Sequence, residues 1–215
     1  MSHLKRISMA KRWPLPRKGT KYVLKSYPGK SFEISMPLGI ALRDILKVTS
    51  TRKETKALLH NKDVKINGKI NEEEKFPLSI FDVLSIPKLN KNFIFLLNES
   101  GKIIFEEINE KDAQTKVCKV INQKILGKGI KQINCMDGWN FICKDKISVN
   151  DSLLIDLKEN KILKILPLKV GSEVFIMGGA HAGEKGKIAE KDKKIIVNIK
   201  NKNFEIQAKN IVVIR

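Results

Sequence analysis

The chain has 215 residues, of which 42 are Lys or Arg and 23 are Asp or Glu, so its formal net charge is +19 and its pI is about 9.8. A basic excess of this size favours nucleic acid or anionic lipid as a partner and is rarely needed by an enzyme that acts on small molecules. Apolar residues make up 42% of the sequence but lie in short runs, and only 6% of residues are aromatic, so we expect two or three small cores.

No segment of the sequence predicts insertion into a membrane or secretion. The longest apolar run, near Phe93–Leu97, is far shorter than the roughly 20 residues that a membrane-spanning helix needs. A tryptophan and two prolines interrupt the first sixteen residues, where a signal peptide would have its apolar stretch. The three cysteines, Cys118, Cys135 and Cys143, include no C-x-x-C pair, which argues against disulfides and against a thiolate zinc site. We therefore expect a cytoplasmic protein with no metal and no cofactor.

The amino-terminal segment, residues 1–36, is strongly basic. Its first thirty residues include nine Lys and Arg and no acidic residue, with aromatic residues set among them. A disordered tail is one interpretation, because no helical or strand periodicity predicts a core here. Rings beside cations are also typical of segments that stack on bases, so we expect an extension that becomes ordered on folded RNA. The candidate RNA-binding residues in this segment are His3, Lys5, Arg6, Lys11, Arg12, Trp13, Arg17, Lys18 and Lys21.

Residues 37–90 begin with two predicted helices. Apolar residues recur at helical spacing over Leu38–Leu46. A second helix is expected after Thr51, which has the spacing of a capping box with Glu54, and it should end near Asn61. Apolar and basic residues fill neighbouring arcs of this helix, so we expect a buried face and a cationic stripe, although an ordinary solvated face is the alternative. The candidate RNA-binding residues on the two helices are Arg43, Lys47, Arg52, Lys53, Lys56 and His60.

A short hairpin is expected after the second helix. Val64–Ile66 alternates as a strand does, and Asn67-Gly68 is a strong hairpin signal because both turn positions must accept a positive φ. After an acidic loop, Leu78–Ile86 is expected to form one further strand. Two helices followed by a small sheet are thus predicted from spacing alone, with Lys65, Asn67 and Lys69 as candidate RNA contacts.

Residues 91–167 change to the short runs typical of β-structure, with turn signals between several of them. We expect a small barrel or rolled sheet, with one helical turn near Asn109–Ala113. The expected strands are Phe93–Leu97, Lys102–Ile108, Val117–Ile121, Ile133–Met136, Trp139–Ile142, Ser152–Leu157 and Ile162–Leu166.

Residues 168–215 are again expected to be mostly β. A glycine-rich loop, Gly178–Lys187, joins the first two strands, and glycines beside lysines favour a phosphate contact. The loop is not a P-loop, because Glu184 occupies the position of the required lysine; a purely structural loop is the alternative. The expected strands are Glu173–Met177, Lys187–Glu190, Lys194–Lys200, Phe204–Ala208 and Ile211–Ile214, and the candidate loop contacts are Gly179, His181, Gly183, Lys185 and Lys187.

No group of side chains in the sequence predicts catalysis. The three histidines, His3, His60 and His181, lie far apart, and none forms a local acid, base or metal cluster with carboxylates. Asp151 and Asp156 flank one expected strand at a spacing that directs them to opposite faces, so they do not form an acid–base pair. We therefore expect no catalytic residue.

These residues resemble the S4e family of ribosomal proteins, which belong to the small subunit in archaea and eukaryotes. The opening His3-Leu4-Lys5-Arg6 is similar to that of the family, the stretch from Leu42 to Ile86 resembles the alpha-L RNA-binding motif, and the stretch from Gly171 to Ile188 resembles a KOW module. Each motif alone occurs in other proteins, but their order after a basic opening is more specific. The middle segment is similar to the family at Lys116–Val120, Val149–Asp151 and Asp156-Leu157.

The resemblance implies an α+β multidomain protein. Its parts would be a basic N-terminal extension (1–36), an alpha-L or S4-type RNA-binding domain (37–90), a central mostly-β domain (91–167) and an SH3-like KOW β-barrel (168–215). The implied function is that of a structural constituent that binds small-subunit rRNA and neighbouring ribosomal proteins, without catalysis, a small-molecule substrate, a membrane or a homo-oligomer.

Two other functions stay open at this point. One is an RNA-modifying or tRNA-acting enzyme that shares the alpha-L motif, although the remaining segments are short for a catalytic domain. The other is a ribosome-associated or transcription factor with a KOW module, which has a similar composition.

Overall fold

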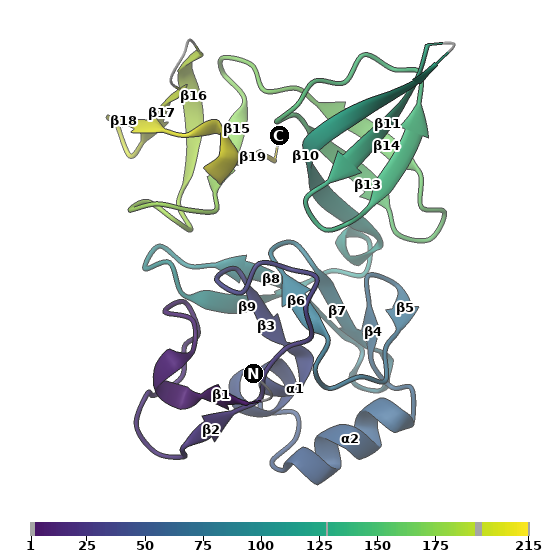
Figure 1. The fold of residues 1–215 in the computed structure, drawn as a ribbon, viewed down its shortest axis with the longest axis vertical. Coiled ribbons are helices and arrows are strands. Elements are labelled where there is room, and N and C mark those ends of the chain that lie inside the picture. Colours follow the sequence, from purple (N-terminus) through teal and green to yellow (C-terminus); the bar gives the residue numbers. More distant parts are fainter. Residues whose placement is uncertain (1–2, 128, 192–194, 215) are drawn as a thin grey trace. The chain divides into compact units, whose positions relative to one another are not determined.

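The computed structural model describes residues 3–127, 129–191 and 195–214, and these form two compact units (Figure 1). Unit one runs to Gln114 except for Glu99–Gly101, and unit two contains that short loop and the chain from Thr115 onward. Each unit has antiparallel sheets of its own, and helices are few and short. The α+β class expected from the sequence is therefore confirmed.

The amino-terminal segment is folded into unit one. β1 (Leu4–Lys5) pairs antiparallel with β2 (Tyr22–Val23), as Figure 1 shows. Trp13 is 1% exposed, and its Nε1 donates a hydrogen bond to the Ser35 carbonyl oxygen at 2.8 Å. The segment therefore contributes a buried side chain to unit one, which the lack of periodicity in its sequence does not predict. The contacts that bury Trp13 come from residues far away in the sequence, and such contacts leave no local periodicity.

Both expected helices are present. The first begins as α1 (Leu38–Ile40) and continues as a π-helical turn over Ala41–Ile45. The second is α2 (Arg52–His60). Its predicted capping box is confirmed, because Thr51 Oγ1 accepts a hydrogen bond from the Glu54 N–H and the Glu54 carboxylate accepts one from the Thr51 N–H.

Unit one contains a five-stranded sheet in the order β5-β4-β7-β8-β9 and a two-stranded ribbon of β3 and β6. The Asn67-Gly68 turn between β4 and β5 has positive φ angles of 50° and 78°, as the sequence predicts. The strands are β3 (Ser35–Pro37), β4 (Lys65–Ile66), β5 (Lys69–Ile70), β6 (Pro77–Ser79), β7 (Val83–Ile86), β8 (Lys91–Leu97) and β9 (Ile103–Ile108).

Two features of this sheet differ from the sequence prediction. Leu78–Ile86, predicted as one strand, is divided into β6 and β7 by a turn in which Phe81 has a φ of 67° and Asp82 Oδ2 accepts a hydrogen bond from the Ser79 N–H at 2.7 Å. The β8–β9 hairpin pairs with β7, so unit one extends beyond residue 90, where we expected a central domain to begin. Alternation predicts a strand, but it does not indicate which sheet the strand joins.

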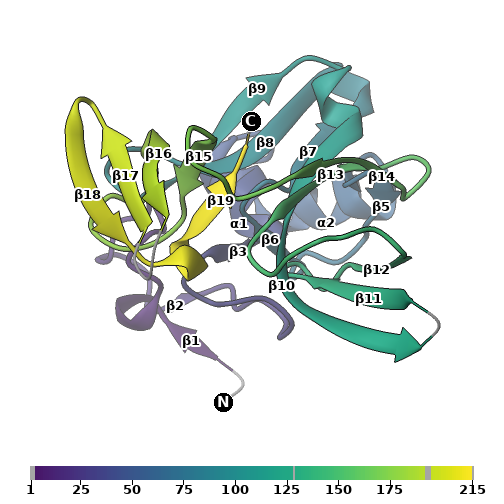
Figure 2. The same ribbon diagram turned by 90° about the horizontal axis from the view of Figure 1, so that it is seen from above.

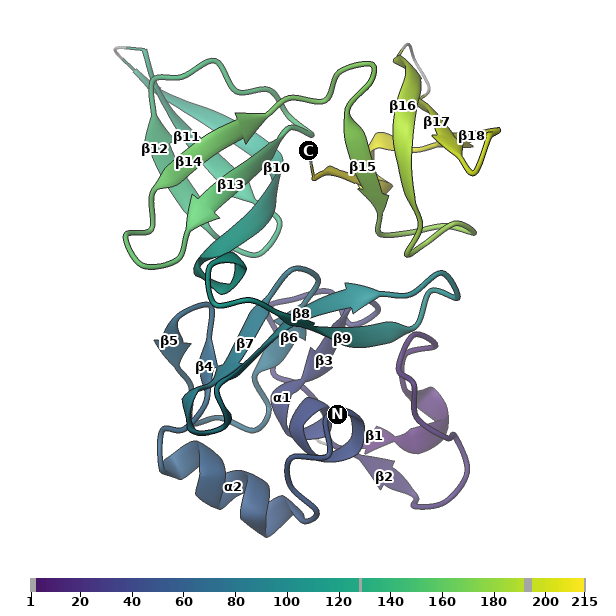
Figure 3. The same cartoon turned by 180° about the vertical axis from the view of Figure 1, so that it is seen from behind.

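Unit two begins with a five-stranded antiparallel sheet in the order β12-β11-β10-β13-β14 (Figure 3). The long strand β10 pairs with both β11 and β13, and a register shift after Val120 lets it bend between them. Ile133, Leu153 and Ile155 contribute to the buried core. The strands are β10 (Thr115–Gly127), β11 (Ile130–Cys135), β12 (Asn140–Cys143), β13 (Ser152–Asp156) and β14 (Ile162–Leu166), and a 3-10 turn, Asp112–Gln114, precedes Thr115.

The second sheet of unit two has the order β18-β17-β16-β15-β19 (Figure 2). Val174, Ile188, Val197 and Ile211 lie in its core. The predicted strands are present here, and Lys194, where one of them was expected to begin, lies outside the described residues. The strands are β15 (Glu173–Ile176), β16 (Lys185–Lys191), β17 (Ile195–Ile199), β18 (Lys202–Ile206) and β19 (Ile211–Val213).

Buried polar side chains join the two sheets of unit two. Lys119 on β10 is 5% exposed, and its Nζ donates hydrogen bonds to the Ala208 carbonyl oxygen at 2.5 Å and the Ile211 carbonyl oxygen at 2.7 Å. Ser152 is fully buried, and its Oγ accepts a hydrogen bond from the Val213 N–H at 2.9 Å. These bonds satisfy main-chain groups that would otherwise be buried without partners.

Candidate nucleic-acid interface

The basic face predicted on α2 is exposed. Thr55 and Leu59, on the neighbouring arc, are 1% and 0% exposed, and the Oγ1 atoms of Thr55 and Thr49 lie 2.8 Å apart in a hydrogen bond. The helix therefore packs on the face that its spacing predicts. The exposed basic residues of α2 are Arg52, Lys53, Lys56 and His60.

An acidic side chain from the loop before β6 neutralises part of this face. Arg52 donates from Nε and Nη2 to the Glu74 carboxylate, with Nε 2.9 Å from Oε2, and Lys56 Nζ lies 4.0 Å from Glu74 Oε1. Glu74 is 7% exposed. The hydrogen bonds from Arg52 lower the pKa of Glu74 despite its burial, and they raise the pKa of Arg52. Arg52 is therefore an anchor that holds α2 to the loop.

Acidic side chains neutralise only some of the other basic residues near α2. His60 Nδ1 and Lys62 Nζ each lie 3.8 Å from a carboxylate oxygen of Glu72. Lys47 and Lys53 are also exposed, and among the described residues neither has a carboxylate within ion-pair distance. Lys53 lies on α2 and Lys47 follows the π-helical turn, and both charges are open to an external phosphate.

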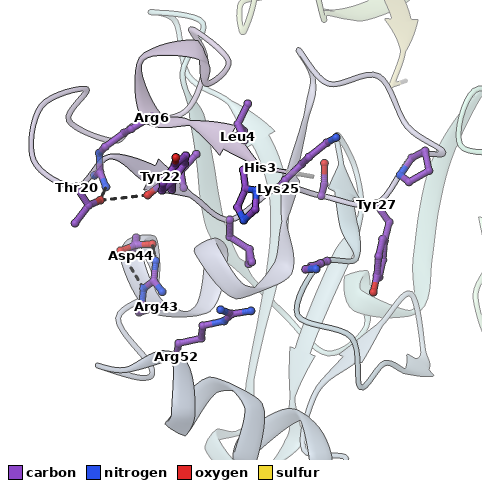
Figure 4. A pocket seen from close by; sticks show the side chains of 15 residues that line it. His3, Leu4, Arg6, Thr20, Tyr22, Lys25, Tyr27, Arg43, Asp44 and Arg52 are labelled. Atoms are coloured by element: carbon purple, nitrogen blue, oxygen red, sulfur yellow. Dashed lines mark hydrogen bonds and ion pairs between the residues drawn. The ribbon is translucent and has the colours of Figure 1, made fainter. Parts of the chain in front are cut away.

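A second basic surface is a pocket of about 790 Å³ between the amino-terminal segment and the helices of unit one (Figure 4). His3 and Tyr22 line it on the amino-terminal side, while Arg43 and Arg52 reach it from the helical side, as Figure 4 shows. We call it the basic pocket. Its lining includes the cations Arg6, Lys25, Arg43, Arg52 and Lys75 and the single acidic residue Asp44.

Hydrogen bonds fix the arginines of the basic pocket. Arg6 donates from Nε to the Pro16 carbonyl oxygen at 2.6 Å and from Nη1 to Thr20 Oγ1 at 2.8 Å. Arg43 donates from Nη2 to Asp44 Oδ2 at 2.7 Å. A guanidinium group that is already held in place loses less conformational freedom when it binds an anion.

The remaining amino-terminal candidates differ in exposure. Trp13 is inside the core, which corrects the expectation that its ring contacts RNA, because a buried indole cannot stack on a base. Arg12 is half-buried, and burial lowers its pKa, an effect that the nearby Glu33 partly opposes. The exposed candidates of this segment are His3, Lys5, Lys11, Arg17, Lys18 and Lys21.

Asn67 also has an internal role, which corrects its prediction as an RNA contact. It is 7% exposed, its Nδ2 donates to Asp82 Oδ1 at 2.8 Å, and its Oδ1 accepts a hydrogen bond from the Val83 N–H at 2.9 Å. Lys30 Nζ lies 2.5 Å from Asp82 Oδ2 and completes this network. The hairpin candidates that face solvent are Lys65, in part, and Lys69.

The glycine-rich loop of unit two is held by its own contacts. A Cβ atom on Gly178 would lie 2.8 Å from Asn210 Oδ1, so a larger residue here would displace the Asn210 side chain. The His181 ring lies 4.0 Å from the Phe204 ring, and its Nδ1 is 2.9 Å from Glu184 Oε2. This local histidine–carboxylate pair was missed in the sequence. The structural interpretation of the loop therefore accounts for several of its residues.

The basic residues at the end of this loop remain exposed. Lys185 and Lys187 are on β16, and they line a hollow of about 610 Å³ together with Lys200. Gly179 and Gly183 have φ angles of 93° and 96°, which suit glycine. This part of unit two can present cations to a phosphate without a change in the loop.

The described residues contain little that would support chemistry. Burial, with a smaller contribution from Asp137, raises the pKa of Cys135 to about 12, so its thiol is not a ready nucleophile. Within residues 3–127, 129–191 and 195–214, no group of three His, Cys, Asp or Glu side chains is placed to hold a metal ion. In the same ranges no helix has both the length and the hydropathy to span a membrane.

Comparisons with known proteins agree on one family. The model of the family described as "Ribosomal family S4e" matches residues 89–162. The small ribosomal subunit protein eS4 of Methanocella arvoryzae is 37% identical to this chain over 190 residues, which cover 88% of this chain and 80% of that protein. The protein of the same name from Methanocaldococcus jannaschii is 34% identical, over 89% of this chain and 82% of that protein.

A solved structure has a similar fold. The crystal structure of the 30S ribosomal protein S4e from Thermoplasma acidophilum has a TM-score of 0.74 and 27% identity, over 84% of this chain and 94% of that chain. The Methanocella arvoryzae protein is identical to this chain at more than a third of the aligned positions, and the alignment extends over most of this chain. The chain therefore belongs to the S4e family of ribosomal proteins.

Proposed function

We propose that this protein is a structural constituent of the small ribosomal subunit that binds 16S- or 18S-type rRNA through phosphate contacts and stabilises its folded form. Its family consists of ribosomal proteins, which are structural components and not enzymes, and its place is the cytoplasmic ribosome. Neighbouring small-subunit proteins are its further partners.

The observation that carries this proposal is the exposed positive charge of unit one. Lys47 and Lys53 project cations without carboxylate partners among the described residues, and the basic pocket adds five more cations against one acidic residue. Lysines that neutralise phosphates release counterions, so each contact contributes about −0.9 to the slope of log K against log salt on duplex RNA or DNA. Such contacts position a protein on the shape of RNA more than on its sequence.

The modules expected from the sequence belong to this proposal. The two helices and the hairpin between Leu38 and Ile86 have the element order of an alpha-L motif, and β15–β19 have that of an SH3-like KOW module. β10–β14 form the central β domain between them. The element order and the membership of the S4e family support these assignments.

The proposed rRNA contacts are the sequence candidates that face solvent at least in part. Trp13 and Asn67 are left out because their side chains are buried. The set is His3, Lys5, Arg6, Lys11, Arg12, Arg17, Lys18, Lys21, Arg43, Lys47, Arg52, Lys53, Lys56, His60, Lys65, Lys69, Gly179, His181, Gly183, Lys185 and Lys187.

The experiment compares salt slopes for two double variants. Binding of the full chain to small-subunit rRNA is measured over a series of salt concentrations for Lys47→Gln with Lys53→Gln. We expect the slope to become shallower by about 2, since two phosphate contacts are lost. The melting temperature should not change, because both side chains are exposed.

The matched control is Lys158→Gln with Lys164→Gln. These lysines are exposed on unit two and are not among the proposed contacts. The control substitutions remove the same net charge as those at Lys47 and Lys53, so a non-specific effect of charge would change the salt slopes of the two double variants equally. Equal slopes for the two double variants would contradict the proposed face on unit one.

A further inference from the structure

We infer that the basic pocket of unit one holds a single RNA nucleotide extruded from its helix, with the base against the Tyr22 ring and the phosphate near the guanidinium groups. This inference rests on the proposed rRNA-binding function and deepens it. The extruded nucleotide is a ligand that the basic pocket can bind and that a flat cationic surface would not distinguish from other RNA.

The rings of the pocket are exposed and held in place. Tyr22 is 48% exposed although it lies on β2, whose pairing with β1 fixes its backbone. The His3 ring lies 5.4 Å from the Tyr22 ring at an angle of 47°. Tyr27, also on the lining, is 46% exposed, and the Lys75 Nζ lies 5.5 Å from its ring. Exposed rings on a rigid frame provide a surface on which a base can stack.

The charges of the pocket suit one phosphate group. Arg43 and Arg52 each bind a carboxylate through Nε and Nη2, and their Nη1 atoms take no part in those ion pairs. Each guanidinium is therefore fixed in orientation and still has donors for an anion. Arg6 lies on the opposite side of the pocket, held by Thr20 (Figure 4). Cations on two sides and rings between them match a ligand with an anionic end and a flat end.

The shape of the pocket favours an extruded nucleotide over continuous duplex. The phosphates of an RNA duplex follow a convex surface, whereas a pocket of about 790 Å³ lies within the usual range for pockets that enclose a small ligand, roughly 300–1,000 Å³. A base that has left its stack exposes a flat face and edges, and sequence-specific contacts to RNA are made mainly to such bases. The pocket lies wholly within unit one, so it does not depend on the placement of unit two.

The test uses three RNA duplexes of one sequence: one fully paired, one with a single bulged adenosine, and one with a bulged abasic nucleotide. The abasic bulge keeps the extra phosphate and the distortion of the helix but lacks the base. We expect the full-length protein to bind the adenosine bulge about 10-fold more tightly than the abasic bulge, which is the magnitude of one base–aromatic contact.

Two variants test whether the preference for the adenosine bulge over the abasic bulge comes from the basic pocket. Tyr22→Leu keeps an apolar side chain but removes the ring, and we expect it to abolish the preference for the adenosine bulge while the affinity for the paired duplex is unchanged. Ile7→Ala is the control, because Ile7 is 75% exposed on the same segment and does not line the pocket. It should keep the full preference, and both variants should keep the wild-type melting temperature.

Equal affinity for the adenosine and abasic bulges would overturn the inference, and so would a preference that survives Tyr22→Leu. Adenosine monophosphate that bound alone as tightly as the bulged RNA would also overturn it, because the ligand would then be a free nucleotide. Each of these results leaves binding to the paired duplex intact. Failure of the proposed function is distinct: in that case none of the three RNAs would bind with a salt-dependent affinity.

Discussion

The Lys119 ammonium group lies inside unit two, where it joins the two sheets. The side chain is almost fully buried, and its acceptors are the main-chain carbonyls of Ala208 and Ile211. Burial lowers the pKa of Lys119 to about 8. In the unfolded chain the pKa of a lysine is about 10.4, so the two states bind protons differently between these values.

We predict that Lys119 makes the protein more stable as the pH rises from about 8 to about 10.4. In this window the unfolded state binds more protons than the folded state, so the free energy of unfolding rises with pH. The free energy of unfolding of the wild type minus that of Lys119→Met should rise by roughly 3 kcal/mol across this pH window, as measured by urea titrations. Subtracting the two values removes the pH dependence that comes from the titratable groups present in both proteins. A difference that is flat with pH would contradict the assigned pKa.

Trp13 tests whether the amino-terminal segment is folded in the absence of RNA. Because its indole is fully buried and bonded to Ser35, Trp13→Ala should lower the free energy of unfolding by about 3–5 kcal/mol. The matched control is Tyr27→Ala, which removes a half-exposed ring from the same segment and should cost far less. Chemical denaturation of the full chain measures both. A loss below about 0.5 kcal/mol for Trp13→Ala would show that the segment does not pack on the rest of unit one.

At the scale of elements, the ion pair between Arg52 and Glu74 connects α2 to the loop before β6. Glu74 is buried whereas Arg52 is exposed. We therefore expect this ion pair to contribute more to stability than a surface ion pair does and less than a fully buried one. We predict that Arg52→Gln lowers the free energy of unfolding by about 1 kcal/mol at neutral pH. Lys53→Gln, the neighbouring change on the same helix, should be within about 0.5 kcal/mol of the wild type.

The pH dependence gives this prediction a second readout. Because Arg52 lowers the pKa of Glu74 below its ordinary value of 4.5, the stabilisation is present above that value and is lost as the pH falls through the pKa of the folded state. The wild type and Arg52→Gln should therefore converge in stability under acid conditions. If the gap between them persisted there, the carboxylate would not be its source. Charge reversal at Arg52 is for the same reason a poor test of RNA binding, since it also breaks this anchor.

The elements that the sequence predicts best are those specified by nearby residues. The capping box of Thr51 and Glu54 and the turn at Asn67 need only three or four positions, and both are confirmed. The strand break at Phe81 and the burial of Trp13 also involve distant partners. The Asp82 carboxylate accepts a hydrogen bond from the nearby Ser79 N–H but also contacts Lys30, and the indole contacts Ser35. Periodicity carries no information about such contacts.

The same contrast applies to the candidate site. Charge and spacing predict which residues are basic and which face of α2 carries them, and those predictions follow from the sequence alone. The pairing of Glu74 with Arg52 and the basic pocket require the folded chain, because Tyr22 and Arg43 come together only when the amino-terminal segment packs beside the helices. Tyr22 is one of the aromatic residues of the basic amino-terminal segment, but nothing in the sequence places it opposite an arginine.

At the scale of the whole molecule, positive charge is spread over both units, and each unit is stabilised by its own buried residues. The exposed basic residues of α2 on unit one and the exposed lysines of β16 on unit two can each contact RNA without unfolding either core. A protein built in this way is suited to hold a large folded RNA at several points.

Sedimentation of small ribosomal subunits from the native organism after a high-salt wash, with this chain quantified by mass spectrometry, tests the structural role most directly. We expect one copy per small subunit to stay with the particle through the wash, because many phosphate contacts and packing against the folded rRNA act together. Release of the chain into the supernatant, or its absence from the washed subunits, would contradict a structural role and would favour an associated factor.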